Sequence, residues 1–377
     1  MKSIRNILAL TTTAAVVAFP GFASAQSAES GFGHAVFVMT NDADSNHVLA
    51  YPRAEDGTLL SAHTFKTGGR GSGGTVDPLS SQGSLTLSTN GAWLFAVNAG
   101  SGTLSVFRVA GSSLDLSDQV PTGGSEPNAV AEHGGLVYVL NTAGTSGVSG
   151  FWLRDGKLSP IAGSRKFLSG NNIGSSSLAF SPDGKFLTVI ERTTNFIDVF
   201  SVQPDGTLSA IKENPSAGPG AFGLLFAPND TAIVSETGSS APNSSAISSY
   251  KVNSDHTLTV VSASVPTLGA ANCWNTVTPD GQFVYASNSA SSSIAGFRIG
   301  ASGALAPLPG TVVGLNPSGS TNLDLAITAD GRFLYSINAA GGSIGAFAID
   351  RTTGTLTNLG AIGGLPASVG FNGIAAN

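Results

Sequence analysis

Polar residues with the chemistry to bind or activate a small molecule recur about once every fifty residues, each directly after an apolar run. They are Asn41, Asn98, Asn141, Glu191, Glu236, Asn288 and Asn338. Side-chain amides can bond the hydroxyl groups of a ligand, whereas a carboxylate can accept a proton from water. Because Glu191 and Glu236 replace the recurrent amide, we predict that they are the catalytic carboxylates. The structural alternative, in which these residues satisfy backbone groups at strand ends, remains open.

Further candidates lie beside this series. Arg192 follows Glu191, and we predict that its guanidinium polarises a substrate carbonyl; a surface ion pair is the alternative. Asp324 lies within an apolar run, where a charge is costly unless it is bonded. It therefore either faces a channel or caps a neighbouring strand. The expected substrate-binding residues are Asn98, Asn128, Asn141, Trp274, Asn288, Asp324 and Asn338.

Short strands joined by tight turns must position these residues. The turn Ser181-Pro182-Asp183-Gly184 recurs at 278–281 and 328–331, and Asp-Gly is a strong hairpin signal. In each unit, one apolar stretch precedes the turn and a second ends at the recurrent Asn or Glu. An alternating third strand, a Gly-Xaa-Leu turn and a fourth strand follow. Seven such units predict an all-β, seven-bladed β-propeller with four antiparallel strands per blade.

The first unit lacks an inner strand, and the end of the chain resembles one. Residues Val369–Ala376 are similar to Ala221–Phe226, the predicted inner strand of the fifth unit. We therefore expect the C-terminal strand to complete blade one and close the ring, which pairs an otherwise exposed edge. Each inner strand starts on the face where the second strand ends. The candidate residues are thus expected to ring one mouth of a central channel.

Composition excludes several classes of protein. The 377 residues include 17 Lys and Arg against 23 Asp and Glu, giving a net charge of −6. Without a basic run, no nucleic-acid partner is expected. The 49 glycines and 11% charged residues argue against a mainly helical protein. Cys273 is the only cysteine, which excludes an internal disulfide and a cysteine-based metal site. We expect no metal and no other cofactor.

Residues 1–25 have the pattern of a secretory signal peptide. Lys2 and Arg5 precede the apolar stretch Ile7–Phe19, and Ala23-Ser24-Ala25 is typical of a cleavage site. The apolar stretch is shorter than the ~20 residues that span a bilayer. We predict a leader over 1–25 and a single propeller domain over 26–377. The mature protein is expected to be periplasmic or secreted, monomeric, and not associated with a membrane after leader cleavage.

Two other motif matches do not carry the chemistry they suggest. Residues Gly69–Gly74 formally match a dinucleotide-binding fingerprint, but Thr75–Pro78 starts no helix. We interpret this segment as a loop between blades, with Arg70 able to hang over the channel mouth. Gly341–Gly345 matches G-x-S-x-G, but it falls on a strand-turn-strand unit. A nucleophile elbow needs a following helix.

Two patterns resemble a known family. Ser181–Leu187 reads S-P-D-G-K-F-L, and Val97–Phe107 reads V-N-x-x-S-x-T-L-S-V-F. Both are similar to repeats of the lactonase family of seven-bladed propellers, which includes bacterial 6-phosphogluconolactonase and fungal carboxymuconate cycloisomerase. The resemblance extends over essentially the whole chain after the leader. It implies a hydrolase that acts on a small-molecule lactone or sugar-like ligand.

The resemblance carries over no catalytic residue. Members of the family usually have His, often Arg-His, just before an inner strand. The corresponding positions here hold Ser176-Ser177, Cys273-Trp274 and Leu323-Asp324.

Two functions are compatible with these observations. The first is an exported, 6-phosphogluconolactonase-like hydrolase in which Glu191 or Glu236 activates water to open a lactone ring. Arg192 or backbone N–H groups would stabilise the oxyanion. The second is a non-catalytic extracytoplasmic propeller that binds a glycan, peptide or partner protein. The missing family histidine and the polar turns rich in Ser and Gly favour the second.

Overall fold

The computed structural model describes residues 33–239 and 241–377. The leader expected over residues 1–25 lies outside the described residues. Strands make up nearly all of the regular structure in the described residues, together with one short 3-10 turn, Ser289–Ser291. No helix in the described part of the chain has the length and apolar character needed to cross a membrane.

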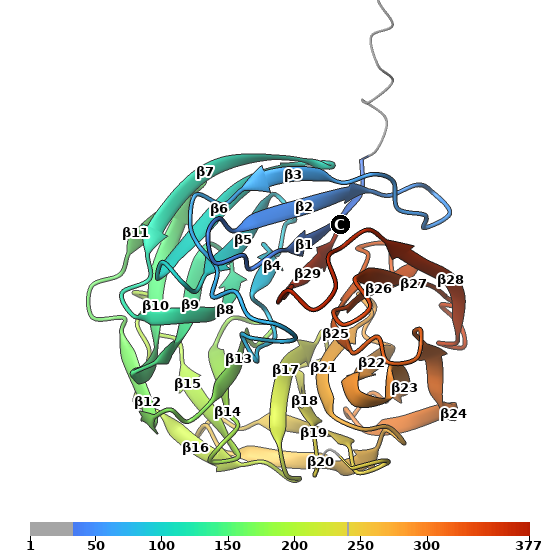
Figure 1. Ribbon diagram of the computed structural model, residues 1–377. Helices are drawn as coiled ribbons and strands as arrows, with labels where there is room; N and C mark the ends of the chain where they lie inside the picture. Colours follow the sequence, from blue (N-terminus) through green and yellow to red (C-terminus); the bar gives the residue numbers. More distant parts are fainter. Residues whose placement is uncertain (1–32, 240) are drawn as a thin grey trace, which may run out of the picture. The chain divides into compact units, whose positions relative to one another are not determined.

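Seven antiparallel sheets follow one another around a ring (Figure 1), which confirms the seven-bladed propeller. From the innermost strand outward, blade 1 contains β29 (Ile374–Ala376), β1 (Ala35–Met39), β2 (His47–Pro52) and β3 (His63–Lys66). Blade 2 contains, in the same order, β4 (Leu85–Leu87), β5 (Trp93–Asn98), β6 (Thr103–Ala110) and β7 (Ser113–Pro121). Blade 3 contains β8 (Ser125–His133), β9 (Leu136–Ala143), β10 (Thr145–Arg154) and β11 (Lys157–Pro160), with β12 (Lys166–Asn171) also paired to β10.

The remaining blades each have four strands. Blade 4 contains β13 (Ser175–Phe180), β14 (Phe186–Glu191), β15 (Phe196–Ser201) and β16 (Lys212–Pro215). Blade 5 contains β17 (Ala221–Ala227), β18 (Thr231–Glu236), β19 (Ala246–Val252) and β20 (Leu258–Pro266). Blades 6 and 7 contain β21 (Asn272–Val277), β22 (Phe283–Asn288), β23 (Ser293–Ile299) and β24 (Leu305–Leu315), then β25 (Asn322–Ile327), β26 (Phe333–Asn338), β27 (Ser343–Ile349) and β28 (Leu356–Gly363).

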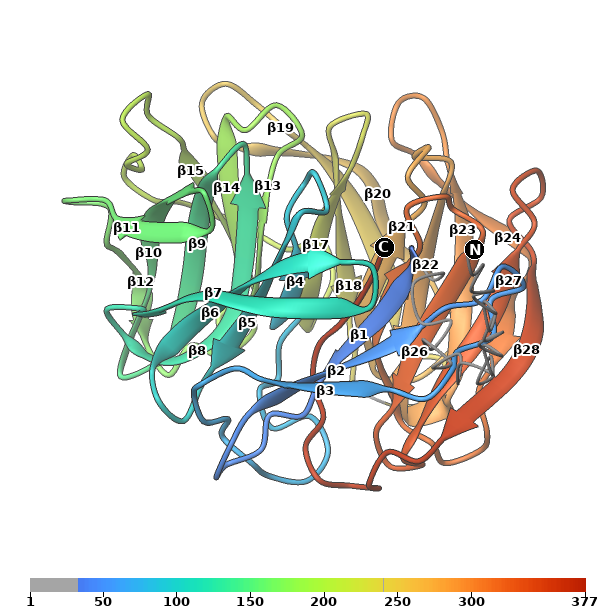
Figure 2. The same cartoon turned by 90° about the horizontal axis from the view of Figure 1, so that it is seen from above.

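The Asp-Gly turns join the inner two strands of a blade, as the sequence predicts. In blade 6, Oδ1 of Asp280 accepts hydrogen bonds from the Thr278 hydroxyl at 2.7 Å and from the backbone N–H of Gln282 at 3.1 Å. Gly281 follows with a φ of 71°, which favours glycine. The turn thus returns the chain along the same blade. The strands run between the two faces of the ring (Figure 2).

Each blade packs its two sides against its two neighbours. The second strands β22 and β26 are therefore buried at every position, on both sides of the strand. This explains why their sequences are nearly continuous apolar runs rather than alternating ones. The outermost strand of a blade is less covered by its neighbours, and β28 is largely exposed.

Buried tyrosines latch neighbouring blades together. In three blades, a tyrosine hydroxyl on the second strand donates to the carbonyl of the Gly-Xaa-Leu turn in the next blade. The pairs are Tyr138 with Gly206 at 2.7 Å, Tyr285 with Gly354 at 2.8 Å, and Tyr335 with Gly57 at 2.7 Å. The repeated turn therefore serves blade packing as well as chain reversal.

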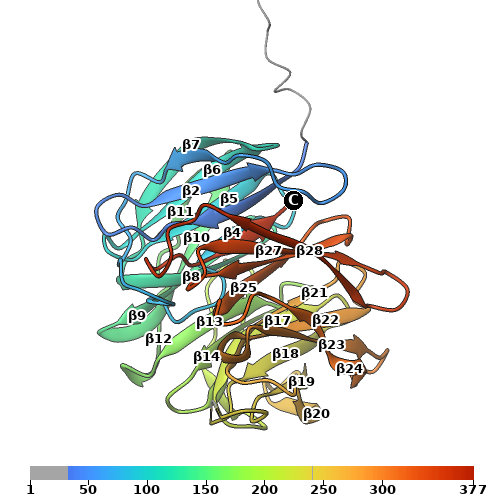
Figure 3. The same cartoon turned by 45° about the vertical axis from the view of Figure 1, so that its right-hand side comes forward.

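The ring closes between the two ends of the described chain. Strand β29 pairs antiparallel with β1, placing Ile374 opposite Val38, which confirms the predicted closure. In Figures 1 and 3 the red C-terminal segment lies beside the blue strands of blade 1. The buried guanidinium of Arg53 in blade 1 adds an ion pair with Asp330 of blade 7, at 3.5 Å. Backbone pairing, this ion pair and the Tyr335 latch hold the first blade to the last.

Candidate active site

The recurrent polar residues at the ends of the second strands are all buried. Their exposed fractions do not exceed 3% for Asn41, Asn98, Asn141, Glu191, Glu236, Asn288 and Asn338. Several of them bind the connector that leads into their own blade. Oδ1 of Asn98 accepts from the Thr67 hydroxyl at 2.7 Å, and Oδ1 of Asn141 accepts from the Thr122 hydroxyl at 2.6 Å. Asn338 receives the Ser320 hydroxyl at 3.4 Å.

Glycines in the connectors lie flat on these side chains. A Cβ added at Gly69 would lie 2.4 Å from Cγ of Asn98, and one at Gly124 would lie 2.5 Å from Cγ of Asn141. Gly269 has the same relation to Asn288, at 2.3 Å. The amide series thus forms part of the packing between connectors and blades. This geometry matches the structural alternative.

Glu191 and Glu236 occupy the same structural position. The carboxylate of Glu191 accepts from Ser169 N at 2.9 Å, from the Ser169 hydroxyl at 2.5 Å and from the Thr194 hydroxyl at 2.7 Å. The carboxylate of Glu236 accepts from Gly218 N at 2.9 Å and from the Ser264 hydroxyl at 2.8 Å. Both side chains are buried. These contacts give both carboxylates a structural task, and their catalytic role stays a prediction.

A second buried acid lies beside Glu191. Asp198, on strand β15, is fully buried, and neither of its oxygens meets a hydrogen-bond donor among the described residues. Burial raises the pKa of Asp198 to about 9, with a further contribution from the negative charge of Glu191. Asp198 therefore keeps its proton at neutral pH, and its own hydroxyl is the donor that can face the Glu191 carboxylate.

The central channel is crossed by the segment around Ser81 and Gln82, which the sequence analysis did not single out. In Figure 1 the connector from β3 to β4, in light blue, reaches into the middle of the ring. Gln82 N donates to the carbonyl of Ser176 in blade 4 at 2.8 Å, and the Gln82 amide exchanges two hydrogen bonds with the backbone of Asn275 in blade 6. Trp274 Nε1 donates to the Ser81 carbonyl at 2.9 Å.

The predicted binding residues Trp274 and Asn128 hold this bridge. Both are at most 1% exposed. The Asn128 carbonyl accepts from the Ser81 hydroxyl at 2.6 Å, while its side-chain amide donates to the carbonyl of Ser175 at 2.8 Å. The bridge therefore joins blades 3, 4 and 6 across the channel.

Asp77 begins this bridge on the face where the inner strands start. Its Oδ1 accepts from Nδ2 of the buried Asn372 at 2.9 Å, so its carboxyl group is directed inward although the residue is partly exposed. Burial raises the pKa of Asp77 to about 7, and the Asn372 hydrogen bond and the charge of Arg192 partly oppose this shift. A carboxyl with this pKa can exchange a proton near neutral pH.

Arg192 supplies a positive charge at the same mouth. Its guanidinium lies 5.0 Å from the ring centre of Phe222, which packs edge-on against Trp274 at 5.1 Å. No ion pair within 4.0 Å involves Arg192 among the described residues. The side chain is thus held by a cation–π contact rather than neutralised by a carboxylate. The expected alternative, a surface ion pair between Arg192 and Glu191, is therefore absent from the described residues.

Asp324 lies in β25, the inner strand of blade 7. It is 4% exposed, and its Oδ1 accepts from Leu325 N at 2.9 Å. Burial raises its pKa to about 7, the backbone N–H groups of Leu325 and Ile374 oppose this, and the charge of Asp77 raises it further. The N–H of Ile374 in β29 is therefore near enough to favour the ionised form of Asp324. It also lies close enough to Asp77 for the two carboxyl groups to influence each other.

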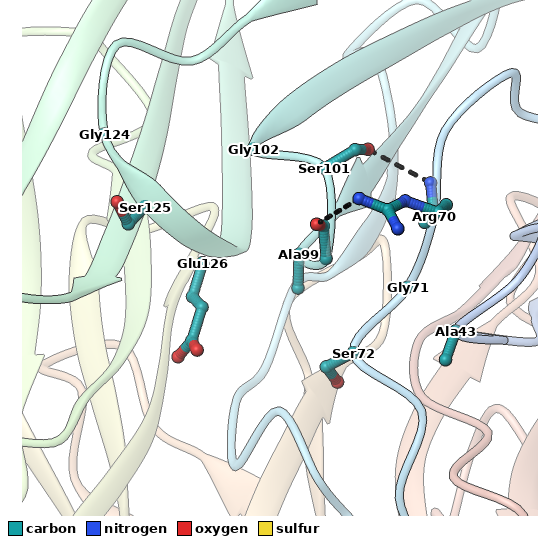
Figure 4. Close-up of a pocket in the computed structure, with 11 residues that line it drawn as sticks. Ala43, Arg70, Gly71, Ser72, Ala99, Ser101, Gly102, Gly124, Ser125 and Glu126 are labelled. Carbon is teal, nitrogen blue, oxygen red and sulfur yellow. Dashed lines mark hydrogen bonds between the residues drawn. The ribbon is translucent and has the colours of Figure 1, made fainter.

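A polar cavity of about 540 Å³ opens on the same face, between blades 1, 2 and 3 (Figure 4). Its charged lining residues are Arg70 and Glu126, and the figure shows Glu126 and Ser72 directed into the open space. The Arg70 backbone N–H donates to the Ser101 hydroxyl at 3.0 Å, which fixes this loop to blade 2. The cavity can offer hydroxyl, cationic and anionic partners to a small polar molecule.

The described residues contain no cluster of three or more His, Cys, Asp or Glu side chains arranged to hold a metal ion. Cys273 is buried, and burial raises the pKa of its thiol to about 12. Its thiolate form, which would be the nucleophile, is therefore scarce at neutral pH.

The model of the family described as "Lactonase, 7-bladed beta-propeller" matches residues 145–274, 221–324 and 275–369. The chain belongs to the lactonase family of seven-bladed propellers. This confirms the resemblance carried by its repeats. No curated protein sequence matches the chain significantly.

Solved structures share this fold. A candidate 6-phosphogluconolactonase from Bacteroides uniformis is 21% identical with a TM-score of 0.65, covering 92% of this chain and 100% of its own. The periplasmic gluconolactonase PpgL of Pseudomonas aeruginosa is 20% identical with a TM-score of 0.65, covering 90% of this chain and 99% of its own. At these identities the similarity shows the fold alone.

The sequence analysis singled out Arg192, Trp274 and Asp324, whose functional roles stay predictions, and did not single out Asp77 or Asn372. One signal was present, since Asp77-Pro78 lies two residues beyond the glycine-rich segment Gly69–Gly74 that is interpreted as a loop. An acid between such a segment and an inner strand lies on the face where the strands start. Only the long-range contacts of the connector show that it enters the channel.

Proposed function

We propose that this lactonase-family propeller is an exported hydrolase that opens a lactone ring at the channel mouth formed by Asp77 and Arg192. One observation carries this proposal. Asp77 has an inward-directed carboxyl group with a pKa of about 7, and the charge of Arg192 acts on it. The guanidinium of Arg192 has no carboxylate partner among the described residues. Such a pair can supply a general base and an oxyanion partner.

The reaction needs one proton acceptor and one positive charge. The Asp77 carboxylate takes a proton from water as the water oxygen attacks the lactone carbonyl carbon. Arg192 stabilises the negative charge that develops on the carbonyl oxygen. The ring C–O bond then breaks, and the proton on Asp77 passes to the departing alkoxide. The product is an open-chain hydroxy acid, which releases a proton to solvent at neutral pH.

We assign the water-activating role to Asp77 in preference to Glu191 and Glu236. A general base needs an oxygen that can reach a water molecule. The carboxylates of Glu191 and Glu236 are buried and already accept several hydrogen bonds each. The carboxyl group of the partly exposed Asp77 accepts a single side-chain hydrogen bond, from Asn372 to Oδ1, which leaves Oδ2 for a water molecule.

The polar cavity on the same face of the ring indicates the substrate class. Its serine hydroxyls, Arg70 and Glu126 suit the hydroxyl groups of a neutral sugar-like lactone. Glu126 disfavours a phosphate group by charge repulsion. The name of the Pseudomonas aeruginosa relative, a periplasmic gluconolactonase, supports both this substrate class and an extracytoplasmic location. The leader pattern over residues 1–25 supports export as well.

The test uses a panel of neutral and phosphorylated aldonolactones with aliphatic lactones, following acid release by a pH indicator. We expect Asp77→Asn and Arg192→Gln to lose most of the kcat/KM, by about 10²-fold or more. Asp44→Asn is the matched control, because Asp44 is an exposed acid in the turn between β1 and β2. For the wild type, kcat/KM should rise with pH and level off above about 7, where Asp77 is ionised.

Two results would oppose the assignment. If a folded Glu191→Gln or Glu236→Gln variant loses activity while Asp77→Asn stays active, the general base is Glu191 or Glu236 and not Asp77. No acid release by the folded wild type across the panel would favour the alternative function. In that case the polar cavity would serve a non-catalytic propeller that binds a glycan, peptide or partner protein.

A further inference from the structure

A second cavity, of about 470 Å³, opens at the opposite end of the channel from the proposed active site. It is lined by the inner strands of blades 2 to 5 and by their turns, including Thr89, Pro182 and Pro228. Gln82, from the segment that bridges the channel, lines its inner end. This volume lies within the range of small-molecule sites.

The character of this cavity differs from that of the polar one. Most of its lining is apolar, with Val130, Leu178 and Leu225 among the side chains. Two partly exposed aromatic rings, Phe180 and Phe226, also line it. A polyhydroxylated ligand would leave hydroxyl groups unpaired against such walls, which is costly. A flat apolar molecule would instead lose little hydration and gain aromatic contact.

The polar groups at the rim restrict the ligand further. The carboxylate of Glu132 already accepts from Thr89 N at 2.7 Å, from the Thr89 hydroxyl at 2.9 Å and from Gly135 N at 2.7 Å. It is therefore occupied, but its negative charge disfavours an anionic ligand. His133, the other titratable lining residue, lies against Phe180 with ring centres 6.0 Å apart. A neutral imidazole can accept a hydrogen bond from a ligand hydroxyl.

We propose that this second cavity binds an uncharged phenol-like molecule, with its ring against Phe180 and Phe226 and its hydroxyl group hydrogen-bonded to His133. The roof of the site is fixed, because the Gln82 amide is bonded in both directions to the backbone of Asn275. The site is therefore separate from the mouth where Asp77 and Arg192 lie. It does not depend on the lactonase activity.

The experiment is calorimetric titration of the full-length protein with p-cresol. We expect saturable binding to the wild type, weakened by about tenfold in His133→Asn and in Phe226→Leu. The matched control is His256→Asn, because His256 is also partly exposed and also packs on a phenylalanine, Phe186, with ring centres 5.9 Å apart. This control should bind p-cresol as the wild type does.

Competition identifies which cavity is occupied. D-Glucono-1,5-lactone at saturating concentration should leave p-cresol binding unchanged, and p-cresol should leave lactone hydrolysis unchanged. The proposal is overturned if the wild type shows no saturable binding. It is also overturned if folded His133→Asn and Phe226→Leu both bind like the wild type, or if the lactone displaces p-cresol. An inactive protein that still binds p-cresol would contradict only the proposed lactonase function.

Discussion

Replacing Asp198 with Asn should make the protein more stable, by an amount that is smallest at acid pH and grows as the pH rises. Asp198 is fully buried beside Glu191, and burial raises its pKa to about 9. Folding therefore requires Asp198 to hold a proton that the unfolded chain releases above its ordinary pKa of 3.8. The free energy of unfolding falls as pH rises between these two values. Asparagine keeps the size and the donor of the protonated acid without this dependence.

The magnitude follows from the linkage between protonation and folding. Between pH 5 and pH 8, folded Asp198 stays protonated while the unfolded residue is ionised. Each pH unit then costs ~1.36 kcal/mol, so the wild type should lose about 4 kcal/mol over these three units relative to Asp198→Asn. Contributions from Asp77 and Asp324 are present in both proteins and cancel in the difference.

The assay is urea unfolding of both proteins at pH 5, 6.5 and 8. Asp44→Asn serves as the control, because it is the same substitution at an exposed position. Its difference from the wild type should not vary with pH. The reasoning is refuted if wild type and Asp198→Asn lose stability in parallel between pH 5 and pH 8. That result would mean that Asp198 is ionised in the folded protein.

Two further predictions concern the packing between blades. Tyr335→Phe should lower the free energy of unfolding by about 1–3 kcal/mol, because the Gly57 carbonyl loses its buried donor; urea unfolding measures this, and an unchanged midpoint would contradict the latch. Gly69→Ala should cost about 3 kcal/mol or more, because its Cβ would lie 2.4 Å from Cγ of Asn98. Combining it with Asn98→Ala should recover part of that loss, whereas strictly additive losses would mean that the two residues do not interact.

The propeller could be predicted because its signals are local and repeated. The Asp183-Gly184 and Asp280-Gly281 turns each fix a hairpin, and the apolar runs beside them show which strands are covered on both sides. Ring closure was predictable because the chain end resembles an inner strand. These features depend on neighbouring residues, which sequence reasoning handles well.

The site was only partly predictable, because its geometry depends on contacts between distant residues. Asp77 meets Asn372 across 295 positions in sequence, and Trp274 meets Ser81 across 193. No local pattern encodes either contact. The strand-end residues were placed correctly along the chain, but their direction was not determined. In the structure, Glu191 and Asn98 turn toward the connectors rather than into open solvent.

The position of β29 makes the order of synthesis matter. The backbone N–H of Ala35 donates to the side chain of Asn377, a separation of 342 residues. A ribosome that adds roughly 5–20 residues per second needs about 17–70 s to make that stretch. Until β29 has been made, blade 1 lacks its innermost strand and has an open inner edge. The ring can therefore become a continuous unit only after translation has reached the last strand, and the earliest residues made are among the last to be secured.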